Sequence, residues 1–341
     1  MKKSLIALAV IAASGAASAQ SSVTLYGLVD AWVGSYKTNG LTQTGVNPTG
    51  GGGFNTSRFG IKGSEDLGGG LKANFLLESG FNASTGAANS YTNPYTGATS
   101  NAVFGRQSWV GLSGGFGEVK VGKMWTPFDD VKGSGAAAFD ANAFAPAAYV
   151  WQSNNYQDRP GNAVYYTTPS FGGVTATGMY SFGENKTSTT GAGHIAAMNV
   201  AYAGGPFAAA LSYQAEKTTG AVTATKFLQF NTSYDLGVVK LLGAYGRTKD
   251  QVSTVEKTNE YQLGLDFPVT STFTVSGGYA WSKDDAFAGS TDTKRHGIGI
   301  AGLYALSKRT TLYVGVNDSK SETGATETKT RVFGAGVRHT F

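Results

Sequence analysis

The stretch TFTVSGGYAW (272–281) carries the pattern that decides the fold. Its odd-numbered positions (F, V, G, Y, W) are mostly apolar or aromatic, and its even-numbered positions (T, T, S, G, A) are polar or small. Successive side chains of a strand point to opposite faces, so this alternation predicts a strand with one apolar and one polar face. The same period occurs in segments 207–214 and 261–267, and no segment shows a sustained helical period.

The composition suits a thin wall rather than a packed core. The 341 residues include 49 Gly, 17 Tyr, 19 Phe and no Cys, and only 14% are charged. Aliphatic residues mostly stand singly, at every second position, which predicts an all-β wall with lipid on one side and water on the other. The formal net charge of +5, or 5 − 2 = +3 without Lys2 and Lys3, is too small and scattered to indicate nucleic-acid binding.

The two ends of the chain indicate an exported protein whose last strand stays paired. A short basic start is followed by the apolar stretch 5–13 and by an A-x-A cleavage site. These features predict a signal peptide, residues 1–19, cleaved after Ala19, and a mature domain, residues 20–341. At the other end, apolar and polar or small positions alternate as far as Phe341, which predicts a closing strand that does not fray.

The connections between predicted strands are of two alternating kinds. Seven are short turns, such as 66–70, and eight are long polar loops, of which the third, 127–160, is the longest. Short turns on one side, long loops on the other and an even strand count are typical of a transmembrane antiparallel β-barrel. About sixteen strands enclose an aqueous channel, whereas about eight would be filled by side chains. The predicted sixteen strands are 22–36, 54–66, 70–84, 101–113, 116–126, 161–169, 172–183, 193–203, 206–216, 225–235, 238–248, 257–267, 271–283, 293–305, 310–319 and 329–341.

Aromatic residues lie mostly near the ends of the predicted strands. Such residues collect at the two interfaces between membrane and water, so we interpret them as two interfacial girdles. They are Tyr26, Trp32, Phe59, Phe81, Trp109, Tyr180, Phe182, Tyr234, Tyr245, Phe267, Trp281 and Tyr304.

Four segments carry a resemblance to a known family. They are SSVTLYGLVDAWV (21–33), SRFGIKGSEDLGGGLKANFLLESGF (57–81), WVGLSGGFGEVKVGKMWTPFDD (109–130) and AVYYTTPSFGGVTATGMYSFGE (163–184). Together they resemble the general-diffusion porins of Gram-negative outer membranes, of the type common in β-proteobacteria. The resemblance runs over nearly the whole chain. It implies a sixteen-stranded barrel in outer-membrane lipid, a homotrimer, and a third loop folded into the lumen. It also implies passive diffusion of small hydrophilic solutes and ions.

The resemblance also names residues at the narrowest point of the channel. Arg58, Arg106 and Arg159 match the arginine cluster that lines the pore constriction of the family. The alternation along the strand also places Arg58 toward the lumen, because its neighbour Phe59 is expected to face lipid. The same alternation places Arg106 on the face opposite Trp109.

Two lysines of lumen parity and three acids of the third loop are further candidates at the constriction. If the loop folds inward, its carboxylates face the water opposite the cations, and the two sets of charge create a field across the passage. These five candidates are Lys72, Lys120, Asp129, Asp130 and Asp140. Lys123 has the opposite parity from Lys120 and is interpreted as a subunit contact. The basic wall favours a weak anion preference, which the loop acids could reverse.

Other function classes find less support. An outer-membrane enzyme would need a catalytic constellation, but the three histidines, His194, His296 and His339, have no convincing nucleophile partner in the sequence. There is no HExxH motif and no Gly-rich phosphate loop, so no metal or cofactor is expected. A substrate-selective channel remains the alternative, because aromatic residues between Phe139 and Tyr156 could form a sugar slide. A soluble all-β protein is the remaining possibility.

Overall fold

The computed structural model describes residues 22–189, 191–218 and 223–341. The expected signal peptide, residues 1–19, lies outside this range. Among the described residues, no helix is long and apolar enough to cross a membrane.

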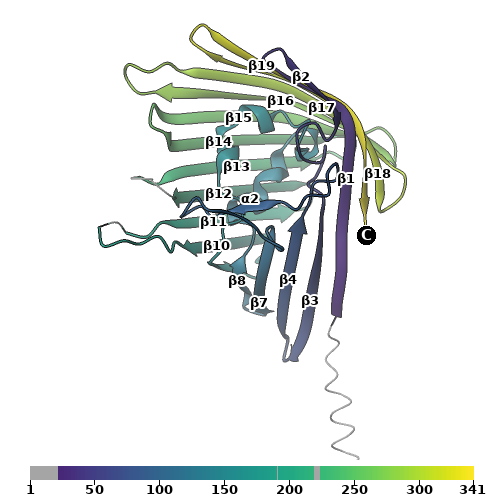
Figure 1. Cartoon of the computed structure of the whole chain (residues 1–341). Coiled ribbons are helices and arrows are strands. Elements are labelled where there is room, and N and C mark those ends of the chain that lie inside the picture. Colours follow the sequence, from purple (N-terminus) through teal and green to yellow (C-terminus); the bar gives the residue numbers. More distant parts are fainter. Residues whose placement is uncertain (1–21, 190, 219–222) are drawn as a thin grey trace, which may run out of the picture.

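The described residues form a closed antiparallel barrel (Figure 1). The sheet contains seventeen strands, of which β2 (Leu41–Val46) only extends the loop end of β1 (Ser22–Thr38), and the other sixteen form the wall. β1 pairs with β19 (Thr326–Thr340) and so closes the ring. Closure gives partners to backbone groups that lipid could not satisfy. The prediction of a sixteen-stranded all-β barrel is therefore confirmed.

The strands agree closely with the predicted segments in the second half of the chain and less well in the first half. Segments 225–235 and 293–305 coincide with β13 and β17, whereas the predicted strand 101–113 begins only at Gln107. The sequence did not predict β2 or the hairpin of β5 (Ser90–Thr92) and β6 (Thr99–Asn101). The other wall strands are β3 (Arg58–Gly68), β4 (Leu71–Gly80), β7 (Gln107–Gly114), β8 (Gly117–Lys123), β9 (Ala163–Thr167), β10 (Val174–Phe182), β11 (His194–Gly204), β12 (Phe207–Lys217), β13 (Thr225–Asp235), β14 (Lys240–Val252), β15 (Val255–Pro268), β16 (Phe273–Ala286), β17 (Thr293–Ala305) and β18 (Thr310–Thr323).

A buried carboxylate explains why β3 begins at Arg58 rather than at the predicted residue 54. Asp30 on β1 has no exposed surface and accepts hydrogen bonds from the N–H groups of Gly53 at 3.0 Å, Phe54 at 3.3 Å and Asn55 at 2.9 Å. These donors are therefore not available to a neighbouring strand, and the chain is held as a loop until β3 starts.

The predicted alternation holds along the wall, but three of the predicted girdle aromatics point inward. The hydroxyl of Tyr26 donates to Glu78, and the buried Trp32 packs edge-on against Phe144. Trp109 lies on the inner face under the ammonium of Lys120, 5.1 Å from the ring centre. The girdle interpretation is therefore wrong for these three residues, because aromatic enrichment near strand ends does not by itself tell the two faces apart.

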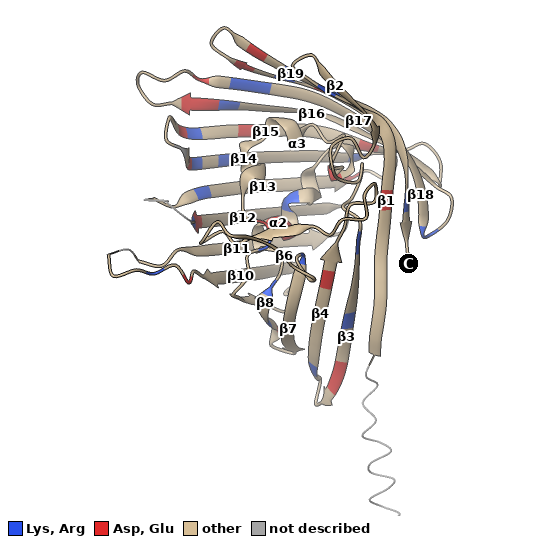
Figure 2. Ribbon diagram, viewed as in Figure 1, with Lys and Arg blue, Asp and Glu red and all other residues tan. Residues whose placement is uncertain are grey.

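The third long connection folds into short helices. They are α2 (Pro127–Lys132), η1 (Gly133–Gly135), η2 (Ala138–Asp140), α3 (Ala147–Val150) and η3 (Gln152–Asn155). Thr126 caps α2 by accepting the N–H of Asp129 at 3.3 Å, and Pro127 fits the first helical position. α2 contacts β10 to β13, and α3 contacts β16 to β18 (Figure 2). The connection thus packs along the long strands of the second half of the chain.

Candidate functional site

The three predicted arginines gather around one cavity of about 370 Å³. Arg58 begins β3, Arg106 stands immediately before β7, and Arg159 follows the helices of the third connection. Each therefore sits where a long connection meets the wall, so residues from three distant parts of the sequence line the same space. We call them the arginine cluster.

A buried carboxylate that the sequence did not reveal organises this cluster. Glu78 on β4 accepts a hydrogen bond from Nε of Arg106 at 2.7 Å, and Nε of Arg58 lies 3.5 Å from its other oxygen. The hydroxyl of Tyr26 donates to that second oxygen at 3.0 Å. Glu78 and Arg106 have side chains only 5% exposed, whereas Arg58 keeps 28% of its side chain exposed. Glu78 thus fixes Arg106 and leaves Arg58 partly free toward the cavity.

An indole ring supports the other side of the cluster. The guanidinium of Arg159 lies 4.1 Å from the ring centre of Trp125, and that of Arg106 lies 5.3 Å from it. Arg guanidinium groups stack on aromatic faces, which orients them without neutralising their charge. Arg159 also pairs with the neighbouring Asp158 at 2.9 Å. Trp125 therefore holds two like charges near each other over one surface.

Acidic residues of the third connection line the same cavity. They include Asp129, Asp140 and Asp158, together with the cation Lys132. Asp129 accepts a hydrogen bond from the hydroxyl of Tyr156, and its burial raises the pKa of its carboxyl to about 7. The ammonium of Lys132 opposes this rise in pKa. The cavity is thus bordered by four cations and three acids, one of which titrates near neutral pH.

The structure does not bring the other three predicted residues to this cavity. Lys120 pairs with Glu118 at 3.5 Å and lies 4.0 Å from the ring centre of Tyr165, whose hydroxyl donates to Asp130 at 2.6 Å. These residues form a neighbouring cluster on β8, β9 and α2. Lys72 lies near the turn end of β4, opposite Ser113 of β7.

One of the parity interpretations needs correction, and the expected subunit contact of Lys123 stays a prediction. Trp109 pairs with Leu76, two residues from Glu78, and so shares the inner face with it, whereas Arg106 precedes β7 and does not follow the strand pattern. The ammonium of Lys123 donates to the carbonyl of Arg159 and lies 3.8 Å from the ring centre of Tyr91. Lys123 is thus engaged within its own chain, beside the arginine cluster.

Uncharged side chains of the long strands hold the main chain of the third connection. They donate hydrogen bonds to backbone carbonyls of this segment and thus let it pack against the wall. The donors are Asn199 to Pro127 at 2.7 Å, Gln262 to Gly135 at 2.9 Å, Asn317 to Phe144 at 3.3 Å, Ser282 to Val150 at 2.7 Å, Gln251 to Gln152 at 3.1 Å and Gln214 to Gln157 at 2.9 Å.

Two carboxylates accept the matching N–H groups. Glu260 on β15 is fully buried and accepts from the backbone N–H of Gln152 and, at 3.0 Å, from that of Ser153, which open η3. Glu216 on β12 accepts from the N–H of Gln157 at 2.6 Å. Together with the six uncharged donors, they tie the third connection to the wall along most of its length.

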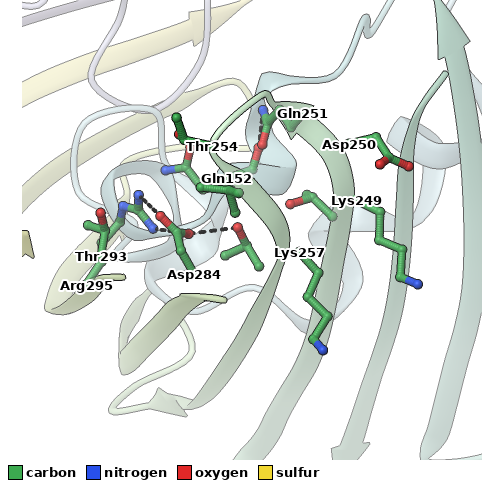
Figure 3. Close-up of a pocket in the computed structure, with 12 residues that line it drawn as sticks. Gln152, Lys249, Asp250, Gln251, Thr254, Lys257, Asp284, Thr293 and Arg295 are labelled. Atoms are coloured by element: carbon green, nitrogen blue, oxygen red, sulfur yellow. Dashed lines mark hydrogen bonds and ion pairs between the residues drawn. The ribbon is translucent and has the colours of Figure 1, made fainter. Parts of the chain in front are cut away.

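A second cavity of about 200 Å³ lies beside this attachment, at the loop ends of β14 to β17 (Figure 3). Figure 3 shows Arg295 and Asp284 facing each other, and their two hydrogen bonds are both 2.8 Å long. Lys249 and Lys257 extend away from this pair in the same view. The arginine of this cavity is therefore already paired with an acid of the neighbouring strand.

Some of the contacts around the site left a trace in the sequence, and others did not. Several inward-facing glycines interrupt the long strands where the third connection approaches: a Cβ on Gly299 would lie 2.2 Å from the carbonyl oxygen of Phe144, and one on Gly264 would lie 2.6 Å from the Cβ of Ala137. Glycine inside a strand marks such a close approach. Glu78 and Trp125 had no comparable signal, because their roles depend on pairing between distant segments.

Comparison with known proteins places this geometry in one family. Residues 5–324 match the family described as Gram-negative porin. Outer membrane porin protein 32 of Delftia acidovorans is 39% identical over 325 residues, which cover 92% of this chain and 88% of that protein. An outer membrane porin protein of Bordetella pertussis is 32% identical over 398 residues, with 100% of both chains covered.

Solved structures agree. An anion-selective porin from Comamonas acidovorans superposes with a TM-score of 0.77 at 33% identity, covering 94% of this chain and 100% of that one. The trimer form of OmpT of Vibrio cholerae superposes with a TM-score of 0.68 at 14% identity, covering 94% and 99%, and so supports the fold alone.

Proposed function

Since the chain belongs to the Gram-negative porin family and is an outer-membrane channel for passive diffusion, we propose that solutes cross it between the arginine cluster and the third connection. The observation that carries this proposal is that Arg58, Arg106 and Arg159 border the same cavity as Asp129 and Asp140. The contacts of the third connection with the inner face of the long strands support an inward position for this loop.

The opposed charges give this passage its selectivity. Cations on the wall and acids on the loop create a field across the path, and a polar solute aligns its dipole with that field. An apolar solute displaces ordered water without replacing its hydrogen bonds, so it crosses slowly. The gradient of the solute drives the movement, and the channel supplies no energy.

The charge balance favours anions weakly. The cavity is lined by Arg58, Arg106, Lys132 and Arg159 against three acids, or 4 − 3 = +1 with all groups ionised. Glu78 beneath the cluster brings the formal sum to 4 − 4 = 0, so any preference rests on its being buried behind the arginines and is weak. The solved porin from Comamonas acidovorans is described as anion-selective, which supports the same preference here.

The unequal strand lengths support a homotrimer. β8 has 7 residues and β9 has 5, whereas a membrane-spanning strand that faces lipid needs about 9–11. The side of the barrel around β7 to β9 is therefore better matched to a protein neighbour than to lipid. OmpT of Vibrio cholerae, a structural neighbour, is described in a trimer form. We expect the purified protein to migrate as a heat-dissociable trimer, and a chain that stays monomeric before heating would contradict this.

The start of the chain fits export to this location. We propose that residues 1–19 are removed as a signal peptide, leaving a mature chain that begins at Gln20. N-terminal sequencing of the protein purified from outer membranes checks the cleavage site. An intact Lys2-Lys3 start would contradict it.

Planar-bilayer recording tests the proposed passage. Reversal potentials in a salt gradient should show a weak anion preference for the wild type, and Arg106→Ala should move it toward cations because the wall loses a charge while Glu78 remains. Arg309→Ala, in the turn before β18, removes an arginine away from the cavity and serves as the control. An unchanged reversal potential in Arg106→Ala, or a clear cation preference in the wild type, would overturn the proposal.

A further inference from the structure

A third cavity lies on the inner face between the arginine cluster and the short turns. It has a volume of about 380 Å³, and its lining includes Lys62, Ser64, Asn74, Leu76, Trp109 and Glu118. Lys62 follows Arg58 by four residues on β3, which corresponds to about 13 Å along the strand. A solute that has passed the arginine cluster toward the turns therefore also passes this cavity.

One cation of the cavity has no acidic partner. Among the ion pairs of the described residues, none involves Lys62, and its ammonium lies 5.3 Å from the ring centre of Tyr26. The acid of the lining, Glu118, is already paired with Lys120 at 3.5 Å. Lys62 is exposed, so its charge is open to a solute. Tyr26 in turn donates to Glu78, which places Lys62 one side chain away from the arginine cluster.

The same cavity offers apolar ring surface. Trp109 and Leu76 face each other across β4 and β7 in register, and both line the space. The ring of Trp109 is oriented by its own N–H, which donates to Gln107 at 3.3 Å. Asn74 is held by Ser113 at 2.9 Å, so the polar floor is fixed as well. A channel wall that only contacts water does not require an inward tryptophan beside an unpaired lysine.

We propose that this cavity is a second solute site, below the constriction, that takes aromatic carboxylates. The carboxylate of such a solute pairs with the ammonium of Lys62, and its ring packs against Trp109 and Leu76, since aromatic rings favour offset or edge contacts with each other. A small inorganic anion would use Lys62 alone, and a neutral ring would use Trp109 alone. The combination selects a solute that carries both groups. This inference rests on the proposed passage past the arginine cluster.

Block of single-channel current by three matched solutes tests the site. Benzoate carries both the charge and the ring, acetate carries only the charge, and benzamide carries only the ring. We expect benzoate to half-block the wild-type channel at a lower concentration than either of the others. Equal block by acetate or by benzamide would overturn the assignment to aromatic carboxylates.

Two variants and their controls locate the block. Lys62→Gln should raise the half-blocking concentration of benzoate about fivefold, the upper range for an exposed ion pair, and Trp109→Leu should raise it by a similar factor. Lys308→Gln, in a turn on the same side, and Trp281→Leu, on the outer face, should leave it within about twofold of the wild-type value. Unchanged block in both Lys62→Gln and Trp109→Leu overturns the site.

The readouts separate this inference from the proposed passage. The two control variants, Lys308→Gln and Trp281→Leu, keep both the arginine cluster and the cavity, so their reversal potentials should equal that of the wild type. If Arg106→Ala shifts the reversal potential while Lys62→Gln and Trp109→Leu leave benzoate block unchanged, the passage stands and the second site falls. If Arg106→Ala has no effect, the passage itself is wrong.

Discussion

The two sides of the barrel wall differ in length and in the chemistry of their inner faces. The strands from β7 to β9 have 8, 7 and 5 residues, whereas β15, β16 and β18 each have 14. We call the wall from β3 to β9, which contains these short strands, the short side; it carries the arginine cluster with its buried Glu78. The long side, from β11 to β18, carries a row of amides and hydroxyls that hold the third connection. Figure 2 shows the charged residues of the long strands mostly toward their loop ends.

This difference separates two tasks that would conflict on one surface. A charged wall attracts solutes but would also attract the acids of a nearby loop and close the gap. Neutral donors on the long side hold the loop by its backbone, which in the proposed passage leaves its acids to face the solute. The position of the loop and the field across the channel are thus set by different residues.

The largest effect on stability is expected from removing the buried ion pair between Arg106 and Glu78 on the short side. Arg106→Ala removes the 2.7 Å partner of Glu78, whose side chain is only 5% exposed, and leaves a buried carboxylate with the more distant Arg58. Removing one member of a buried ion pair costs about 3–5 kcal/mol, and we expect the lower end because Arg58 remains. Urea unfolding in detergent measures this loss.

A double variant separates charge burial from lost packing. In Arg106→Ala combined with Glu78→Gln, the carboxylate is gone as well, so most of the lost stability should return. A double variant as unstable as Arg106→Ala alone would show that packing around Trp125, rather than the buried charge, dominates. Selectivity should move back toward the wild-type value in the double variant, because one charge of each sign has then been removed.

The next effect is expected where the third connection touches the long side most closely. A Cβ on Gly299 would lie 2.2 Å from the carbonyl oxygen of Phe144 and 2.6 Å from Cδ of Pro146, so Gly299→Leu should force the loop away. Overpacking of this kind costs about 1–3 kcal/mol. We expect a higher and more variable single-channel conductance. Gly178→Leu is the control, since nothing lies within 4 Å of its Cβ position, and equal conductance changes in both variants would contradict this account.

The same contrast explains how much of the molecule the sequence predicted. Long strands with a strict period of two, such as 225–235 and 293–305, were predicted at their correct bounds because lipid on one face and water on the other impose the pattern directly. Period alone did not predict where β3 begins, since Asp30 and Trp32 on β1 are buried by the chain that precedes β3 instead of facing open solvent. There, contacts between distant segments decide where a strand begins.

The candidate site follows the same division. The arginines were found through a resemblance, and their number and charge are visible in the sequence. Their organisation was not, because Glu78, Tyr26 and Trp125 act through pairing across three strands and a loop, which no local pattern encodes. Asp129 and Asp140 were predicted from the loop alone, but Lys120 and Asp130 belong to a neighbouring cluster that only the fold reveals.

A smaller effect is expected from removing one donor of the long side. Gln262→Met deletes the hydrogen bond to the carbonyl of Gly135 at 2.9 Å and should cost about 1 kcal/mol. Because five other donors remain, the loop should stay in place but fluctuate more, which open-channel noise measures. Gln229→Met is the matched control, since Gln229 donates only to Asn231 within the wall. Greater noise in the control than in Gln262→Met would contradict the role of the donor row.

The smallest effect is expected from the titration of Asp129. Burial raises the pKa of this carboxyl to about 7, so it is charged above that pH and becomes neutral as the pH falls through it. The cavity charge then changes from 4 − 3 = +1 to 4 − 2 = +2, and the anion preference should increase on acidification from pH 8 to pH 6. A unit charge about 6 Å away in water changes the energy of an ion by about 0.7 kcal/mol, so the permeability ratio should change by about threefold at most.

Asp129→Asn assigns this titration to one residue. The variant is neutral at every pH, so its reversal potential at pH 8 should already resemble that of the wild type at pH 6, and the pH dependence between these values should flatten. Salt screens the interaction, so the difference should shrink when the recordings are repeated at about 1 M salt. If Asp129→Asn keeps the full pH dependence of the reversal potential, another acid of the loop titrates instead. In that case the packing of the loop against the long side does not bury Asp129.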